Sequence, residues 1–137
     1  MKASKIQVGG DHYKVWKIQP FEFFVKNHIP FHRADIIKRI MRYDLPSGKG
    51  LEDLKKIKHE VDLIIEWEDF NDLPLIEFKI SKKEFCEINQ LPAQKRAIIW
   101  LILGYHILPQ VAVADLLIIK NLIDEIIEKE YNENTKI

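Results

Sequence analysis

The stretch KIQPFEFFVKNHIPFHRADIIKRIMRY, residues 17–43, decides the fold because a related stretch occurs later in the same chain. Shifted by 62 residues, it aligns without a gap with KISKKEFCEINQLPAQKRAIIWLILGY, residues 79–105. The alignment continues to residue 68 over residue 130, with 19 identities in 52 positions. Self-similarity at a fixed offset is typical of a structural repeat. The sequence therefore predicts a duplication, with a first copy at about 13–68 and a second copy at about 75–130.

Each copy has the pattern of three helices. Pro20 suits the first position of a helix, and Ser81 followed by Glu84 forms a capping-box pattern. In the last helix of the first copy, apolar residues recur with the 3.6-residue period of one helical face. The predicted helices cover about 20–27, 32–43 and 51–68 in the first copy, and about 82–89, 94–105 and 111–130 in the second.

The two copies together are expected to form one compact all-α domain. A unit of about 60 residues has a thin core and needs a partner. The duplication supplies that partner in the same chain, so we predict a pseudo-twofold bundle of about six helices. Two segments that alternate loosely, Tyr13–Ile18 and Leu75–Ile80, also align and are predicted to pair as a tiny two-stranded ribbon.

Composition excludes several classes of protein. A single cysteine, Cys86, excludes an intrachain disulfide, and 21 basic against 21 acidic residues weigh against a uniformly basic nucleic-acid binder. The first residues lack the apolar run of a secretory signal, so we expect a reducing cytoplasm. The apolar stretch 97–119 contains Pro109 and maps onto two helices and a turn. We therefore expect a buried hairpin there and no membrane span.

Charge separates the two copies. Residues that are charged in the first copy are replaced by apolar residues or glycine in the second: Lys38 by Trp100, Arg39 by Leu101, Arg42 by Gly104, Glu52 by Ala114, Lys55 by Leu117 and Lys56 by Ile118. Over 97–103 the second copy is apolar on every side of its helix, which predicts burial on every side. The second copy is thus expected to be a structural partner, while the first carries the polar surface.

The polar surface contains a candidate anion site. Lys38 and Arg42 are four residues apart on one helix, so both can bind the same anion. Basic residues grouped in this way are also typical of a solvated helix face. Glu52 and Asp53 lie in the first turn of the next helix. One interpretation is that these acidic residues stabilise the N-terminus of that helix. The other is that they hold Mg²⁺ beside a phosphate. The second copy keeps Asp53 as Asp115, which favours a structural role for that residue.

The segment Gly9–Lys14 precedes the first copy and has no equivalent in the second. Its two glycines permit a close approach of the backbone to a ligand. Neither a G-x-G-x-x-G motif nor a P-loop occurs, so the standard phosphate-binding loops are absent from the sequence.

Four motifs together resemble a known family. GGDHYK (9–14), IQPFEFF (18–24), IIKRIMRY (36–43) and GLEDLKKIKHEVDLIIE (50–66) are similar to the SaV-like family of small tailed-phage proteins, a domain of unknown function. They also resemble part of an early podophage nucleotide kinase that lacks a P-loop. The resemblance implies a nucleotide substrate, Mg²⁺ and the host cytoplasm. It places Glu52 or Asp53 near the metal, and it implies that the phosphates are bound by His12, Lys14, Lys38, Arg42 and Lys56.

Two functions follow as hypotheses. The first is a phage nucleotide-binding protein, including a nucleoside monophosphate kinase of phage nucleotide metabolism; the sequence leaves open whether it is an enzyme. The second is a non-enzymatic phage interaction protein, which inhibits a host protein or sequesters a nucleotide signal of host defence. A nucleic-acid partner is disfavoured by the neutral charge. The internal pseudo-dimer leaves room for a homodimer.

Overall fold

The computed structural model describes residues 16–73, 75–104 and 108–132, and every regular element in them is an α-helix. The predicted all-α bundle of about six helices is confirmed. Its elements are α1 (Pro20–Asn27), α2 (Phe31–Arg42), α3 (Leu51–Trp67), α4 (Lys82–Ile88), α5 (Ala93–Ile102) and α6 (Pro109–Tyr131).

Local chemistry explains where the helices begin and end. Pro20 opens α1, and the Ser81 hydroxyl accepts a hydrogen bond of 3.0 Å from the Glu84 N–H at the start of α4. Beyond the ends of α1 and α4, the aligned residues His28 and Gln90 both have φ of 53°. This left-handed conformation ends a helix and redirects the chain. Both short helices are thus followed by the same kind of turn.

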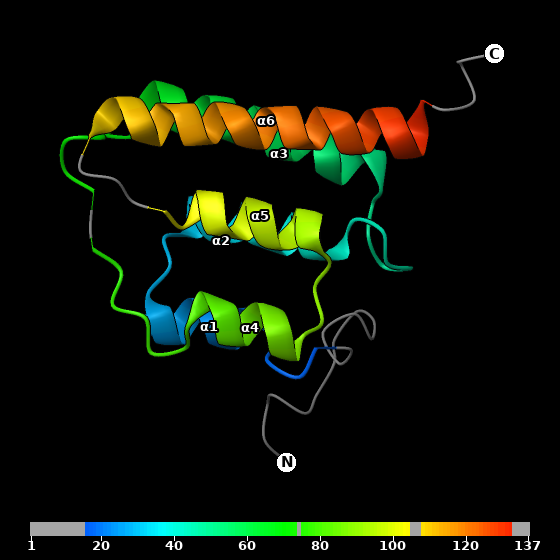
Figure 1. The fold of residues 1–137 in the computed structure, drawn as a ribbon, viewed down its shortest axis with the longest axis horizontal. Helices are drawn as coiled ribbons and strands as arrows, with labels where there is room; N and C mark the ends of the chain where they lie inside the picture. Colours follow the sequence, from blue (N-terminus) through cyan, green and yellow to red (C-terminus); the bar gives the residue numbers. More distant parts are fainter. Residues whose placement is uncertain (1–15, 74, 105–107, 133–137) are drawn as a thin grey trace.

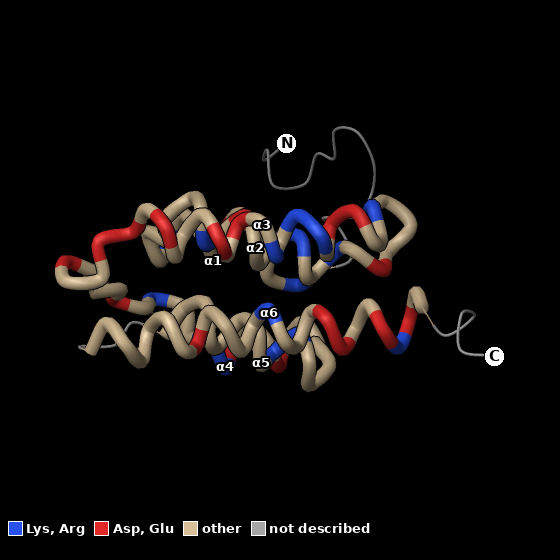
Figure 2. The backbone as a smooth tube through the Cα atoms, turned by 90° about the horizontal axis from the view of Figure 1, so that it is seen from above, with Lys and Arg blue, Asp and Glu red and all other residues tan. Residues whose placement is uncertain are grey.

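The helices form two layers. Figure 2 shows α1, α2 and α3 on one side of the molecule and α4, α5 and α6 on the other. In Figure 1 the two layers overlap so that α6 lies over α3, α5 over α2 and α4 over α1. The packing contacts agree, since α3 packs against α6 and α2 against α5. Each helix therefore lies beside the helix that the alignment gives as its counterpart.

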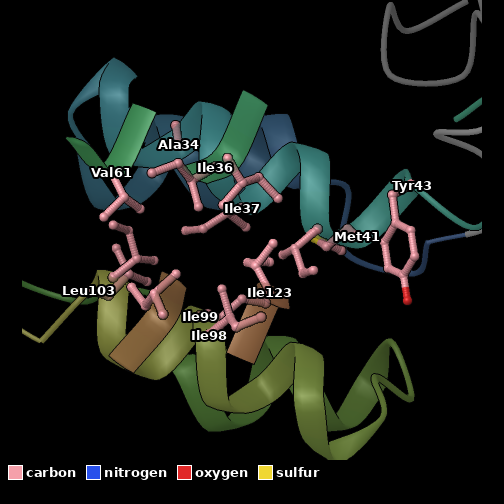
Figure 3. Close-up of a cluster of buried hydrophobic side chains, with 14 of the residues drawn as sticks. Ala34, Ile36, Ile37, Met41, Tyr43, Val61, Ile98, Ile99, Leu103 and Ile123 are labelled. Carbon is pink, nitrogen blue, oxygen red and sulfur yellow. The ribbon is translucent and has the colours of Figure 1, made fainter. Parts of the chain in front are cut away.

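The core lies between the layers. Figure 3 shows Ile36, Ile37 and Met41 of α2 opposite Ile98 and Ile99 of α5, and all five side chains are at most 1% exposed. Lower in the bundle, the rings of the aligned residues Phe23 and Phe85 stack with their centroids 4.0 Å apart. Burial of these side chains removes apolar area from water, the main stabilising contribution in folding.

Two asparagines tie the layers together in place of the predicted ribbon. Asn27 Oδ1 accepts from the N–H groups of Lys79 and Ile80 at 2.8 and 3.0 Å, and Asn27 Nδ2 donates to the Ile80 carbonyl at 2.9 Å. Asn89 does the same for Lys17 and Ile18, at 2.9, 3.1 and 2.8 Å.

The two-stranded ribbon is therefore a wrong prediction for the described residues. The backbones of both segments bond to asparagine side chains, and no strand occurs in the described part of the chain. Residues 13–15 of the predicted ribbon lie outside it. The matched asparagine contacts are those that a duplication leads one to expect, and the duplication and its twofold symmetry stay predictions.

A buried cation binds a carbonyl at the C-terminal end of the middle helix of each layer, α2 and α5. Arg33 Nη1 donates to the Ile102 carbonyl of α5 at 2.6 Å, and the aligned Lys95 Nζ donates to the Met41 carbonyl of α2 at 3.0 Å. Both side chains are at least nine-tenths buried. Cations near the C-terminus of a helix stabilise its unpaired carbonyls. Each layer thus caps the central helix of the other.

The apolar stretch 97–119 runs through α5 and the first half of α6. Among the described helices, none combines the length and the apolar character that a membrane crossing requires.

Candidate functional site

The outer face of α2 and α3 holds a network of charged side chains centred on Arg39. Arg39 Nε donates to Asp35 Oδ2 at 2.9 Å and to Glu60 Oε1 at 2.7 Å, and Arg39 Nη1 donates to Asp53 Oδ1 at 3.0 Å. One guanidinium therefore joins a carboxylate of its own helix to two of α3. We call Asp35, Arg39, Arg42, Asp53 and Glu60 the ionic network.

Asp53 is the buried anchor of this network. Its side chain is 0% exposed. Oδ1 accepts from Arg39 and from Arg42 Nη2 at 3.2 Å, and Oδ2 accepts from the Lys49 N–H at 2.9 Å. Burial alone would raise the pKa of this carboxyl, but the Lys49 N–H and the two arginines outweigh burial and hold the pKa below its ordinary value. Asp53 is thus a charged carboxylate that positions both arginines.

The bond from Asp53 to the Lys49 N–H also fixes the start of α3. The chain enters the helix through Gly50, whose φ of 56° favours glycine. A Cβ on Gly50 would lie 3.2 Å from the hydroxyl oxygen of Tyr131, the last residue of α6. The structural interpretation of Asp53 is therefore supported: it holds the turn that leads into α3.

Glu60 and Asp35 share one donor and influence each other. Burial, together with the Asp35 carboxylate, raises the pKa of Glu60 to about 7, against the opposing effect of Arg39. Burial alone would raise the pKa of Asp35, but a hydrogen bond with Glu60 and the charge of Arg39 lower it below the ordinary value. At neutral pH this pair therefore carries less than two full negative charges.

Four lysines of α2, of α3 and of the turn between them have weaker attachments than the side chains of the ionic network. Lys38 Nζ lies 3.5 Å from Asp35 Oδ1, and Lys56 Nζ lies 3.6 Å from Glu52 Oε1. Both distances exceed the usual length of a charged hydrogen bond. The exposed side chains of Lys49 and Lys55 make no ion pair within the described part of the chain. These lysines are free to turn towards an added anion.

The structure places the predicted site residues as follows. Lys38 and Arg42 lie on neighbouring turns of α2, as the spacing predicts, and Asp53 of α3 binds Arg42 directly. Lys56 lies one turn further along α3, exposed and beside Glu52. His12 and Lys14 lie outside the described residues.

The magnesium assignment stays a prediction. Both oxygens of Asp53 already accept protein donors, and Glu52 lies exposed beside Lys56. Within residues 16–73, 75–104 and 108–132, no group of three His, Cys, Asp or Glu side chains is arranged to hold a metal ion. The carboxylates of Glu52 and Asp53 alone therefore do not form a magnesium site.

Sequence reasoning missed the residue at the centre of the network. The sequence pattern identifies Arg39 only as a charge that is lost in the second copy, and it does not identify Asp35 or Glu60 as site residues. A signal was present: these three positions are charged in the first copy and align with Ala97, Leu101 and Leu122 in the second. A joint loss of charge at aligned positions indicates residues that pair with one another.

The equivalent face of the second copy corrects one prediction. Complete burial of 97–103 is wrong, since Trp100 is 41% exposed. On α6, Leu117 and Ile118 are 47% and 44% exposed. Helix α5 packs against α2, α6 and α4, and Trp100 stays partly exposed beside Lys82 of α4.

Cys86 and Tyr43 are core residues rather than reactive groups. Cys86 is 0% exposed, and burial raises the pKa of its thiol to about 11. Tyr43 is 5% exposed and donates to the Glu130 carboxylate at 2.9 Å. Both side chains therefore contribute to packing; Tyr105, which aligns with Tyr43, lies outside the described residues.

Comparison with known proteins found no matching family model, no matching curated protein and no matching solved structure. The resemblance to the SaV-like family stays a prediction from the four motifs.

Proposed function

We propose that the outer face of α2 and α3 binds the phosphate of a nucleotide. The observation that carries the proposal is the arrangement of Arg42. Its guanidinium is held from one side by the buried carboxylate of Asp53, while Lys38 lies one turn away on the same helix. An arginine positioned by a buried acid presents its remaining N–H groups in a fixed direction, which suits a phosphate.

The charge balance of this face supports an anionic ligand. Residues 35–60, which span most of α2 and the first half of α3, contain seven lysines and arginines against five aspartates and glutamates, an excess of two positive charges. Because the pKa of Glu60 is about 7, the excess is larger still near neutral pH. In Figure 2 a group of Lys and Arg positions, drawn in blue, lies in the layer of α1, α2 and α3.

Two kinds of contact would contribute to binding. Arg42 supplies directional hydrogen bonds, and Lys38 and Lys56 supply mobile ammonium groups. A hydrogen bond to a charged group contributes about 1.5 to 3 kcal/mol, so the loss of two lysine contacts should weaken binding at least about a hundredfold. The proposal is one of binding; kinase activity is what the resemblance implies.

The test is a titration with deoxynucleoside monophosphates and with ATP, each with and without Mg²⁺, followed by thermal shift and calorimetry. A ligand at a hundred times its dissociation constant should stabilise the protein by about 2.7 kcal/mol. The double variant Lys38→Ala/Lys56→Ala should lose this stabilisation. The matched control is Lys83→Ala/Lys129→Ala, which removes two exposed lysines of the second copy.

Each result decides one question. Loss of binding in Lys38→Ala/Lys56→Ala but not in the control supports the proposal. Equal affinity in both double variants, or no stabilisation by any phosphate compound, contradicts it. Formation of ADP in the mixture of ATP and a monophosphate would extend the proposal from binding to the kinase reaction.

A second candidate function, a non-enzymatic interaction protein, is favoured by a separate observation. The second copy exposes apolar side chains at positions where the first copy has charged ones, among them Trp100, Leu117 and Ile118. Surfaces of this kind mark protein interaction sites. Variants of this surface should then lose a partner while retaining phosphate binding.

A further inference from the structure

The outer side of α5 and α6 carries a group of exposed apolar residues that the fold leaves uncovered. We call them the apolar face: Trp100 of α5, Leu108 immediately before α6, and Val111, Ala114, Leu117 and Ile118 of α6. Their spacing along α6 follows the three- and four-residue steps of adjoining helical faces. In Figure 2 the first half of α6 shows almost no charged residues.

The internal packing of the bundle does not explain this face. The aligned positions in the first copy are Lys38, Pro46, Lys49, Glu52, Lys55 and Lys56, which are mostly charged residues exposed on the same kind of helix pair. Charged side chains are therefore compatible with these positions of the fold. Exposed apolar residues at such positions indicate a surface that is covered by another molecule.

We propose that a second copy of this chain covers the apolar face, in a symmetric dimer that packs α5 and α6 of one protomer against those of its partner. In a twofold interface each surface meets itself, so a face with an excess of one charge repels its own copy. The outer face of α2 and α3, with its excess of cations, is excluded by this rule.

The apolar face satisfies the same rule. Between Ala97 and Lys120 the only acidic or basic residue, histidine aside, is Asp115. Lys82 of α4 lies beside this face, with its ammonium 5.1 Å from the centroid of the Trp100 ring. An apolar centre with charges only near its margin is the usual composition of a protein interface.

The size of the face sets the expected strength. A standard interface uses about 20 to 30 residues on each side, several times the number of residues in the apolar face. We therefore expect a dimer with a dissociation constant in the micromolar range. This inference does not depend on phosphate binding, because the two outer faces belong to different layers.

The first test is sedimentation velocity of the full chain over a concentration series that reaches the high micromolar range. The wild-type chain should pass from monomer to dimer. The variant Trp100→Lys/Ile118→Lys, which introduces the residues of the first copy, should remain monomeric. The matched control Phe21→Lys/Val25→Glu introduces second-copy residues at two exposed apolar positions of α1 and should still form the dimer.

The outcomes separate the alternatives. A wild-type chain that stays monomeric throughout the series overturns the proposal, and so does one that binds a different protein through this face while staying monomeric. Dimers that persist in Trp100→Lys/Ile118→Lys, or that are lost in the α1 control, place the interface elsewhere and also overturn it. Circular dichroism confirms that each variant is folded.

Cysteine cross-linking locates the interface without disturbing the apolar residues around it. Cys86 is fully buried and its thiol is protonated at neutral pH, so it provides a silent background. Ala114→Cys should give covalent dimers with a bis-maleimide reagent. The aligned variant Glu52→Cys, on the outer face of α3, should not. Equal cross-linking of the two variants, or no dimer from Ala114→Cys, would refute the assignment.

Discussion

The α2/α3 pair and the α5/α6 pair occupy matching places in the two layers, but their outer sides have opposite chemistry. On the first pair, Arg39 joins carboxylates of both helices and Asp53 holds Arg42. On the second pair, Leu101 stands in place of Arg39, Gly104 in place of Arg42 and Leu122 in place of Glu60. The same helix packing is therefore compatible with an ion-pair network and with an apolar surface.

The inner sides of the two layers differ far less. Asn27 and Asn89 make the same three hydrogen bonds, and Phe23 stacks on Phe85. Aligned residues of the two layers therefore make the same contacts between the layers, whereas the aligned residues that face solvent differ in chemistry. This contrast indicates that the interface between the layers holds the fold and that the outer sides are available for function.

The largest difference between the layers should appear at the two aligned aspartates. Asp53→Asn removes the charge that two arginines surround, and breaking such a buried pair costs about 3 to 5 kcal/mol of unfolding free energy. Asp115 is half-buried, and its layer has no arginine at positions 101 and 104. Asp115→Asn should therefore cost less than Asp53→Asn. Equal losses in urea unfolding would show that the ionic network is not what stabilises the first layer.

The next effect should be the same in both layers. Asn27→Ala and Asn89→Ala each remove three hydrogen bonds to the other layer, at about 1 kcal/mol for each bond. We expect each variant to lose about 2 to 3 kcal/mol of unfolding free energy in urea titrations. A much larger loss in one of them would mean that the layers are not held together symmetrically.

A smaller, pH-dependent effect should belong to the first layer alone. The folded-state pKa of Glu60, about 7, lies above its ordinary value of 4.5. The folded protein therefore binds this proton more tightly, and the stability that Glu60 contributes is present in acid and is lost as the pH rises from 4.5 through 7.

Glu60→Gln should flatten the pH dependence of the melting temperature in that window. Glu66→Gln, which changes an exposed glutamate on the same helix, provides the matched control and should leave the pH dependence unchanged. If both variants follow the wild-type profile, the titration of Glu60 does not contribute to stability.

The smallest effect concerns two exposed ion pairs between α3 and α6. Lys58 Nζ lies 2.5 Å from Asp124 Oδ1, and Lys120 Nζ lies 2.7 Å from Asp62 Oδ1. Exposed pairs contribute about 0.2 to 1 kcal/mol. Double-mutant cycles should give small coupling energies of similar size for both pairs. A coupling above about 2 kcal/mol for either pair would place it outside the range of exposed pairs.

Much of the fold follows from the sequence. The helical period and the end signals at Pro20 and Ser81 predict the six helices closely, because these signals are local. The ribbon failed for a non-local reason. Alternation near Lys17 and Lys79 resembles a strand, but Asn27 and Asn89, distant in sequence, satisfy those backbones instead.

The candidate site was harder to predict than the fold. Spacing on one helix identified Lys38 and Arg42, and retention in both copies indicated a structural role for Asp53. The central position of Arg39 depends on how α2 and α3 face each other, which a single helical pattern does not contain. The exposure of Trp100 could not be predicted for a similar reason. Apolar composition alone does not distinguish a helix side that is buried in the core from one that is exposed on the surface.

The most direct test of the account is a map of backbone amide chemical shifts during titration with a deoxynucleoside monophosphate. If the outer face of α2 and α3 binds phosphate and the outer side of α5 and α6 does not, the shift changes should be confined to residues 38–42 and 49–56. The amide signals of α5 and α6 should stay unchanged. No shifts at saturating ligand, or shifts centred on α5 and α6, would contradict it.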